Sequence, residues 1–275
     1  MNSIAPTPDE TAAEVLAVID RRGQIEPLSE RPSGLDLASA YEGAAAVRRL
    51  REQRGERVVG RKIGFTNTTI WAEYNVGAPI WGYVYDTTLH RLADLDGRFD
   101  ISALVEPRIE PEIMFGISRA PEPGMDERAL LSCIEWVAHG FEVVQSIFPD
   151  WRFTAADTVA AFGLHGALLV GPQAAVRPET TAEWYDALAG FEIALARDGE
   201  AADHGRASNV LADGPLTALR HLVEVLAADS SAPPLAAGEV ISTGTLTRAL
   251  PIRTGETWST KLSGIALSGV TVTVV

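Results

Sequence analysis

Residues 106–116 of the chain, EPRIEPEIMFG, place three glutamates within seven positions of a segment that otherwise predicts a buried β-strand. Glutamate is a poor strand former, and burying its carboxylate is unfavourable unless a partner compensates the charge. Alternate residues of a strand share a face, so Glu110 and Glu112 project side by side and repel each other. The fold must therefore either expose these carboxylates or provide a cation for them.

A third carboxylate, Glu142, lies in FEVVQSIF with apolar residues on both sides, so it also needs a partner. Three carboxylates without nearby histidine or cysteine partners suit a hard cation that binds oxygen, Mg²⁺ or Mn²⁺, with positions left for substrate and water. Alternatively, Glu110 and Glu112 line the solvated face of an edge strand, marked by Pro111. Because Glu-X-Glu is a common pattern, spacing alone favours the edge strand. Glu106 precedes a proline and is expected to be solvated.

Composition and charge restrict the possible partners. The net charge of −14 would repel nucleic acid, and no stripe of Lys and Arg offsets it. A small anionic substrate stays compatible with this charge, because a bound dication reverses the local field. The chain has no apolar stretch of the ~20 residues that a membrane helix needs, and its start is acidic, so we expect a cytoplasmic protein. Cys133 is the single cysteine, which excludes an intrachain disulfide.

Two amphipathic helices are predicted at the start of the chain. The first, over residues 7–22, begins with Thr7, Pro8 and Glu10, which fit a capping box with proline at the first helical position. The second is expected over about residues 36–54.

After these helices the pattern changes to short strands and turns. Further helices are predicted at 125–140 and 214–227, and a hairpin is predicted to turn at Asp198-Gly199. The last forty residues are expected to be nearly all β.

The fold class that follows is α+β. A helical N-terminal subdomain, residues 1–57, is expected to pack on a β-rich catalytic body, residues 58–275, as one integrated domain.

Two further segments are candidates for binding. Lys62 in GRKIGF would ordinarily be exposed, but beside a pocket it could act as an acid or base or hold a carboxylate. The STGT stretch at 242–245 could bind a carboxylate through hydroxyls and backbone N–H groups, although alone it is a turn.

These segments, in this order, resemble the fumarylacetoacetate hydrolase superfamily, and within it the branch of 2-hydroxypenta-2,4-dienoate (2-keto-4-pentenoate) hydratases and 4-oxalocrotonate decarboxylases. The resemblance runs from Ala40-Tyr41 to the C-terminus through GRKIGFTN, APIWGYVYDTT, EPRIEPEIMF, FEVVQS, AADTVA, GPLTALRHLV and GEVISTGTLTRALPIRTGETW. It implies a β-rich roll of the fumarylacetoacetate hydrolase C-terminal type with a helical N-terminal part, assembled as a homo-oligomer.

The resemblance implies a metal site. The metal-binding Glu-X-Glu of the family falls on Glu110 and Glu112, and its third metal carboxylate falls on Glu142. With this correspondence the metal site is favoured over the edge strand.

The resemblance also implies catalytic and substrate-binding residues. The catalytic lysine of the family falls on Lys62, and the acidic residue of the following glycine-aromatic segment falls on Asp86. The loop that binds the substrate carboxylate falls on Thr243, Gly244 and Thr245.

The chain departs from the family pattern after DTV. Hydratases commonly carry ADNASS there, whereas this chain has Ala161, Phe162, Leu164 and His165 in the corresponding stretch, and Gln145 replaces an expected aspartate. If these positions line the pocket, the pocket is more apolar than in the family, with His165 as its new titratable group. His165 is otherwise a hydrogen-bonded residue at the start of a strand.

The function implied by the resemblance is metal-dependent hydration of a 2-hydroxy-2,4-dienoate to a 4-hydroxy-2-oxo acid, in the catabolism of ring-cleavage products. The ion would be Mg²⁺ or Mn²⁺, the substrate a small anionic 2-oxo acid, and Lys62 and Asp86 would move protons. The alternatives are a 4-oxalocrotonate-type decarboxylase, a C–C bond hydrolase of a 1,3-dicarbonyl compound, and a non-catalytic partner subunit. A complex with another enzyme of the pathway is also implied.

Overall fold

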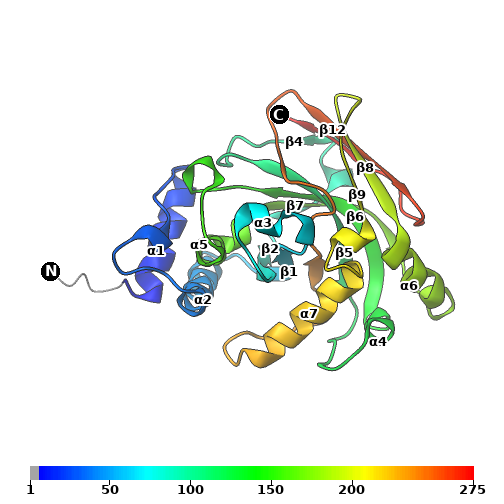
Figure 1. Ribbon diagram of the computed structural model, residues 1–275, viewed down its shortest axis with the longest axis horizontal. Helices are drawn as coiled ribbons and strands as arrows, with labels where there is room; N and C mark the ends of the chain where they lie inside the picture. Colours follow the sequence, from blue (N-terminus) through cyan, green and yellow to red (C-terminus); the bar gives the residue numbers. More distant parts are fainter. Residues whose placement is uncertain (1–5) are drawn as a thin grey trace.

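The computed structural model describes residues 6–275, which form two mixed β-sheets with helices grouped at one end and along one side (Figure 1). The predicted α+β class is confirmed. In this part of the chain, every helix is too short or too polar to cross a membrane.

The larger sheet has the strand order β2-β1-β10-β5-β6-β7-β3, and β11 also pairs with β5. Its strands are β1 (Val58–Gly64), β2 (Ile80–Tyr85), β3 (Leu89–Arg91), β5 (Arg108–Ile117), β6 (Ile134–Val144), β7 (His165–Ala175), β10 (Val240–Ser242) and β11 (Leu250–Pro251). Strand β5, which carries the Glu-X-Glu motif, has neighbours on both sides. The edge-strand alternative for Glu110 and Glu112 is therefore wrong.

Pro111 is compatible with this central position. The carbonyl of Pro111 accepts a hydrogen bond from the N–H of Leu246, which belongs to the loop on the β10 side of β5. The backbone N and O of one strand residue point to the same side, so the N–H that proline lacks would also have faced this loop. The ladder between β5 and β6 is left intact.

The smaller sheet has the order β4-β13-β12-β8-β9. Its strands are β4 (Arg98–Phe99), β8 (Glu192–Arg197), β9 (Glu200–Arg206), β12 (Thr257–Ser263) and β13 (Thr271–Val274). Strands β8 and β9 form the predicted hairpin, and Asp198 and Gly199 both adopt positive φ at its turn, as a tight two-residue turn requires.

Seven α-helices lie within residues 6–275. They are α1 (Pro8–Asp20), α2 (Leu37–Gln53), α3 (Trp71–Tyr74), α4 (Glu127–Leu131), α5 (Ala155–Ala160), α6 (Thr181–Gly190) and α7 (Pro215–Ala228). The capping box of α1 is confirmed, because the Thr7 hydroxyl accepts from the Glu10 N–H at 3.3 Å and the Glu10 carboxylate accepts from the Thr7 N–H at 2.8 Å.

The predicted helix over 125–140 is wrong for most of its length. Helix α4 ends at Leu131, and the chain from Ile134 onward is strand β6, paired with β5 on one side and β7 on the other. The apolar residues of this segment fit either periodicity, and only the two neighbouring strands select the extended form. This correction moves Glu142 to the far end of a long central strand.

Three large apolar cores and a smaller one around Met114 and Leu168 hold the elements together in residues 6–275. One lies between the larger sheet and the helices α4, α6 and α7, and a second joins α1, α2 and α5 at the left end of Figure 1. The third fills the space between the two sheets, around Phe141 and Trp258. The second core also contains Ile147, Phe148 and Phe162, so the N-terminal helices pack against the segments that follow β6.

Candidate metal centre

The strand register brings the predicted metal carboxylates together. Glu142 on β6 is the Cα partner of Glu110 on β5, so their side chains share a face of the sheet with Glu112, two residues further along. Lys62 on β1 is the partner of Ser242 on β10, and Ser242 is the partner of Met114 on β5. Lys62 therefore projects from the same face as the three glutamates.

The three glutamates form a group that fits a metal ion. One oxygen from each of Glu110, Glu112 and Glu142 lies within 4.8 Å of the others. Glu112 and Glu142 are almost completely buried, and among residues 6–275 neither Glu112 Oε1 nor Glu142 Oε2 has a hydrogen-bond partner. A buried carboxylate oxygen without a hydrogen bond is unfavourable; Lys62 compensates Glu142 Oε2 in part, and a divalent ion bound by oxygen would satisfy both atoms.

The loop after β10 fixes Glu112. The Ser242 hydroxyl donates to Glu112 Oε2, and the backbone N–H of Gly244 donates to the same oxygen at 2.8 Å. Thr243 is tied to β5, because its hydroxyl and its N–H donate to the carbonyl of Ile113 at 2.9 and 3.1 Å. The loop thus leaves Glu112 Oε1 as the oxygen available to a cation.

Lys62 carries the positive charge next to these carboxylates. Its Nζ lies 3.3 Å from Glu142 Oε2 and donates a hydrogen bond of 2.9 Å to the carbonyl of Gly163. Burial alone would lower the pKa of Lys62, but the attraction of the three glutamates outweighs it and raises the pKa. Lys62 is therefore protonated at neutral pH.

The carboxylates differ in how tightly they hold a proton. Burial raises the pKa of Glu110 to about 7, a change that Lys62 opposes and Glu142 strengthens. Burial, with the charges of Glu142 and Glu110, raises the pKa of Glu112 well above its ordinary value. Burial acts on Glu142 in the same direction, but Lys62 and His165 hold its pKa below the ordinary value. Without a bound cation, the three carboxylates thus repel one another, and protonation of Glu110 and Glu112 is favoured.

His165 forms a hydrogen bond with Glu142. Its Nδ1 lies 2.7 Å from Glu142 Oε1, and its Nε2 lies 2.9 Å from the Thr88 hydroxyl. Burial lowers the pKa of His165 more than Glu142 raises it, so the ring is neutral at pH 7. Because a carboxylate only accepts, Nδ1 carries the proton and Nε2 can accept from Thr88. His165 is thus placed to orient a metal ligand.

Glu110 and Glu112 line a cavity that is mostly apolar. The polar side chains of its lining are Lys62, Glu110, Glu112 and Thr245, together with the Tyr74 hydroxyl. Thr245 is the residue of the predicted carboxylate-binding loop that reaches the cavity, and its own hydroxyl donates to the Thr247 carbonyl at 3.0 Å. The rest of the lining is Ile63, Gly64, Phe65, Ile70, Ile80, Val144, Trp151, Phe153, Gly163, Leu164 and Ala249.

Asp86 is not brought to this site. It follows β2, and its carboxylate accepts from the N–H of Arg57 at 3.0 Å and from Arg57 Nε at 2.9 Å. These bonds lower the pKa of Asp86, and the residue is not part of the cavity lining. The contacts within residues 6–275 place Asp86 in a surface ion pair with Arg57.

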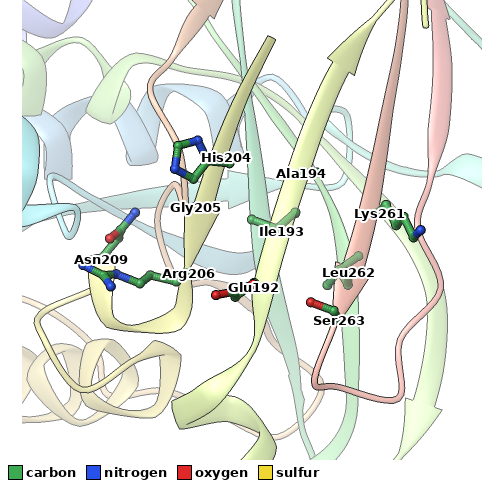
Figure 2. Close-up of a pocket in the computed structure, with 10 residues that line it drawn as sticks. All are labelled: Glu192, Ile193, Ala194, His204, Gly205, Arg206, Asn209, Lys261, Leu262 and Ser263. Carbon is green, nitrogen blue, oxygen red and sulfur yellow. The ribbon is translucent and has the colours of Figure 1, made fainter. Parts of the chain in front are cut away.

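A larger depression lies elsewhere, on the smaller sheet (Figure 2). Figure 2 shows its side chains spread across β8, β9 and β12, with His204 and Arg206 on one strand and Lys261 on another. It shares no lining residue with the cavity at Lys62. The buried acidic group therefore makes the cavity at Lys62 the candidate active site.

Comparisons with known proteins agree with this site. No model of a protein family matches the chain. The chain is 31% identical over 245 residues to 2-hydroxyhexa-2,4-dienoate hydratase from Comamonas testosteroni, covering 88% of each. It is 30% identical over 224 residues to a 4-oxalocrotonate decarboxylase from a Pseudomonas species, covering 80% of this chain and 82% of that one.

A solved structure shows the same fold. The 4-oxalocrotonate decarboxylase of Pseudomonas putida G7, complexed with magnesium and adipate, aligns with a TM-score of 0.86 at 24% identity, over 98% of this chain and 97% of that chain.

The acidic triad, the lysine and the apolar cavity define the site of a metal-dependent enzyme. The chain belongs to the fumarylacetoacetate hydrolase superfamily, in the branch of 2-hydroxydienoate hydratases and 4-oxalocrotonate decarboxylases. The family and fold predicted from the sequence motifs are confirmed, and so is the prediction of an enzyme, which leaves the non-catalytic alternative without support.

Some residues of the site were missed by the sequence analysis. The carbonyl of Gly163 accepts from Lys62, and the cavity is also lined by Tyr74, from α3, and by Trp151 and Phe153, from the segment at 151–153. The positive φ of Gly163 suits a glycine, but a single glycine in AFGLHG gives no signal of this contact. Aromatic residues that lie far apart in the sequence likewise form no pattern that predicts that they line the same cavity.

Proposed function

We propose that the chain is a metal-dependent hydratase that adds water to a 2-hydroxy-2,4-dienoate and yields a 4-hydroxy-2-oxo acid. The observation that carries this proposal is the group of Glu110, Glu112 and Glu142, whose oxygens approach within 4.8 Å beside the protonated Lys62. The similarity to a 2-hydroxyhexa-2,4-dienoate hydratase over most of both chains supports hydration as the reaction.

Glu110, Glu112 and Glu142 would hold Mg²⁺ or Mn²⁺. When bound, such an ion would supply positive charge that stabilises the negative charge developing on the 2-oxygen of the substrate. Thr245, which belongs to the same lining, would contact the bound headgroup.

Lys62 would deliver protons. Of the described residues that line the cavity, Lys62 is the one with a positive charge, and its pKa is raised. The hydrogen bond to the Gly163 carbonyl orients its Nζ. Ketonisation of the dienol needs a proton at carbon, and a positioned ammonium group can supply it. Asp86 is too strongly tied to Arg57, outside the lining, to share this role in the same site.

The proposal is tested by mixing the protein with Mg²⁺ or Mn²⁺ and a 2-hydroxy-2,4-dienoate and following loss of the ultraviolet absorbance of the diene. We expect turnover that requires the metal and is lost in Lys62→Met. Carbon dioxide release from 4-oxalocrotonate with no hydration of any dienoate would instead support the decarboxylase alternative, which the second relative favours. Release of two acids from a 1,3-dicarbonyl compound would support the hydrolase.

Assembly as a homo-oligomer, alone or with another enzyme of the pathway, stays a prediction of the sequence analysis. Sedimentation of the purified protein tests the first part. The 57/58 boundary between the helical and β-rich parts is likewise still a prediction.

A further inference from the structure

We propose that the cavity selects substrates whose far end is apolar, a methyl or short alkyl group, and discriminates against those that end in a second carboxylate. This inference rests on the proposed function, because it places the 2-oxo acid headgroup at the acidic triad and the rest of the substrate along the remaining lining. It names the substrate class of that same site.

One side of the lining is a continuous wall of aromatic rings. The rings of Phe65 and Tyr74 lie 5.9 Å apart between centroids, Tyr74 stacks on Phe153 at 5.9 Å, and Trp151 meets Phe153 edge to face at 5.9 Å. The four rings come from the end of β1, from α3 and from the segment at 151–153. Because each ring packs on the next, the wall is held in place before any ligand arrives.

Aliphatic side chains complete the lining. Ile70, Ile80 and Leu164 are each less than a tenth exposed, and Ala249 lines the same cavity as Phe65 and Trp151. Between the aromatic wall and these residues, the tail of a substrate would meet carbon almost everywhere.

Among the described residues that line the cavity, no second cation is available to pair with a distal carboxylate. Lys62 is the cation of the lining, and its Nζ is held by Gly163 and Glu142. The nearby Arg108 is engaged by the aromatic wall, with its guanidinium 4.0 Å from the centre of the Trp151 ring and its Nη1 donating to the Tyr74 hydroxyl at 3.1 Å. Arg108 does not line the cavity.

The physical consequence is a difference in binding between two substrate tails of equal carbon number that end in a methyl group or in a carboxylate. A methyl group gains from burial against these residues, whereas a carboxylate would lose its water without gaining an ion pair. Burying a charge without a partner weakens binding more than losing the apolar contact of one methylene group does.

The decisive experiment is calorimetric titration of the Mg²⁺-loaded protein with two unreactive 2-oxo acids, 2-oxohexanoate and 2-oxohexanedioate. They share a six-carbon chain and the metal-binding headgroup, and differ in ending as methyl or carboxylate. We expect 2-oxohexanoate to bind at least about tenfold more tightly. Equal or tighter binding of the diacid overturns the inference and would direct attention to Arg108 and Tyr74.

A pair of variants at Ala249 locates the selection. Ala249→Arg places a guanidinium in the lining, and we expect the preference for the methyl-ended acid to shrink to within about threefold, because the distal carboxylate now has a partner. Ala249→Met adds similar length without charge and should keep the preference. Oxalate, which occupies only the headgroup position, reports whether each variant is still folded and metal-bound. An unchanged preference in an Ala249→Arg protein that binds oxalate overturns the inference.

Binding and turnover separate this inference from the proposed function. A protein that prefers 2-oxohexanoate but hydrates no dienoate would keep the inference and contradict the hydratase proposal. A protein that hydrates dienoates with either end equally well, and binds both oxo acids equally, would support the hydratase proposal and contradict the inference.

Discussion

Glu110 and Glu142 stand directly opposite each other in the ladder between β5 and β6. Like charges at that position of an antiparallel pair are destabilising, and here the repulsion is increased by burial. Lys62, with its Nζ 3.3 Å from Glu142, offsets only part of this repulsion. The pKa values of the other two carboxyl groups, Glu110 and Glu112, stay raised. Function as a metal site explains why the chain keeps this arrangement.

Replacing one ligand should abolish metal binding and strengthen the apo fold. In Glu110→Gln the charge repulsion at Glu142 disappears, so we expect a higher melting temperature without metal, no further rise with Mn²⁺, and a loss of turnover of roughly a hundredfold or more. Calorimetry and thermal melts measure both effects. Glu106→Gln, at an exposed position just before the same strand, is the matched control and should behave as wild type.

Metal binding should depend on pH with a definite sign. The raised pKa of Glu110, about 7, means that this group stabilises the apo fold below its ordinary pKa and loses that contribution as the pH rises through about 7. Mg²⁺ needs the deprotonated form, so the thermal shift it produces should be larger at pH 8 than at pH 6, with proton release near pH 6.5. Titration in buffers of different ionisation enthalpy measures the release, and its absence would contradict the assignment.

His165 is expected to orient Glu142 and not to exchange protons with substrate. Because its Nδ1 meets Glu142 Oε1, His165→Leu should weaken Mn²⁺ binding by about 10–100-fold, the range typical of groups that hold a metal ligand. The amide of His165→Asn can replace Nδ1 and should restore most of the affinity. Loss of turnover in both variants with metal affinity intact would show a catalytic role instead.

Gly244 should tolerate no side chain. A Cβ at this residue would lie 1.7 Å from Thr66 Oγ1, and its φ of +95° also favours glycine, while its N–H holds Glu112. We expect Gly244→Ala to lower both stability and metal affinity, the stability by about 1–3 kcal/mol or more. Gly238→Ala is the control, since its φ is +90° with nothing within 4 Å, and it isolates the backbone strain from the clash. Chemical denaturation with metal titration compares the two, and equal losses would contradict the role of the close approach.

Asp86 should be dispensable for the reaction. Its pairing with Arg57 outside the cavity predicts that Asp86→Asn keeps kcat/KM within about twofold of wild type, as expected for an exposed ion pair. Steady-state kinetics with the dienoate tests this. A drop of two orders of magnitude would restore the proton-transfer role that the family motif implies.

The sequence by itself determined the local parts of this protein. Thr7 and Glu10 cap the first helix, Asp198-Gly199 turns a hairpin, and alternation along β5 puts Glu110 and Glu112 on one face. Each of these depends on residues a few positions apart, so the pattern contains the whole cause. The order of motifs also indicated the family, and with it Glu142 and Lys62.

Only the tertiary structure decided which residues meet. The segment after Leu131 became a strand because β5 and β7 flank it, and its register set Glu142 opposite Glu110. The same packing set the hydrogen bond between His165 and Glu142 and the one between Asp86 and Arg57. Strand register and sheet neighbours depend on contacts between segments far apart in the chain, which no local spacing encodes. Composition supplied the carboxylates, and the sheet gave them a common place to bind a cation.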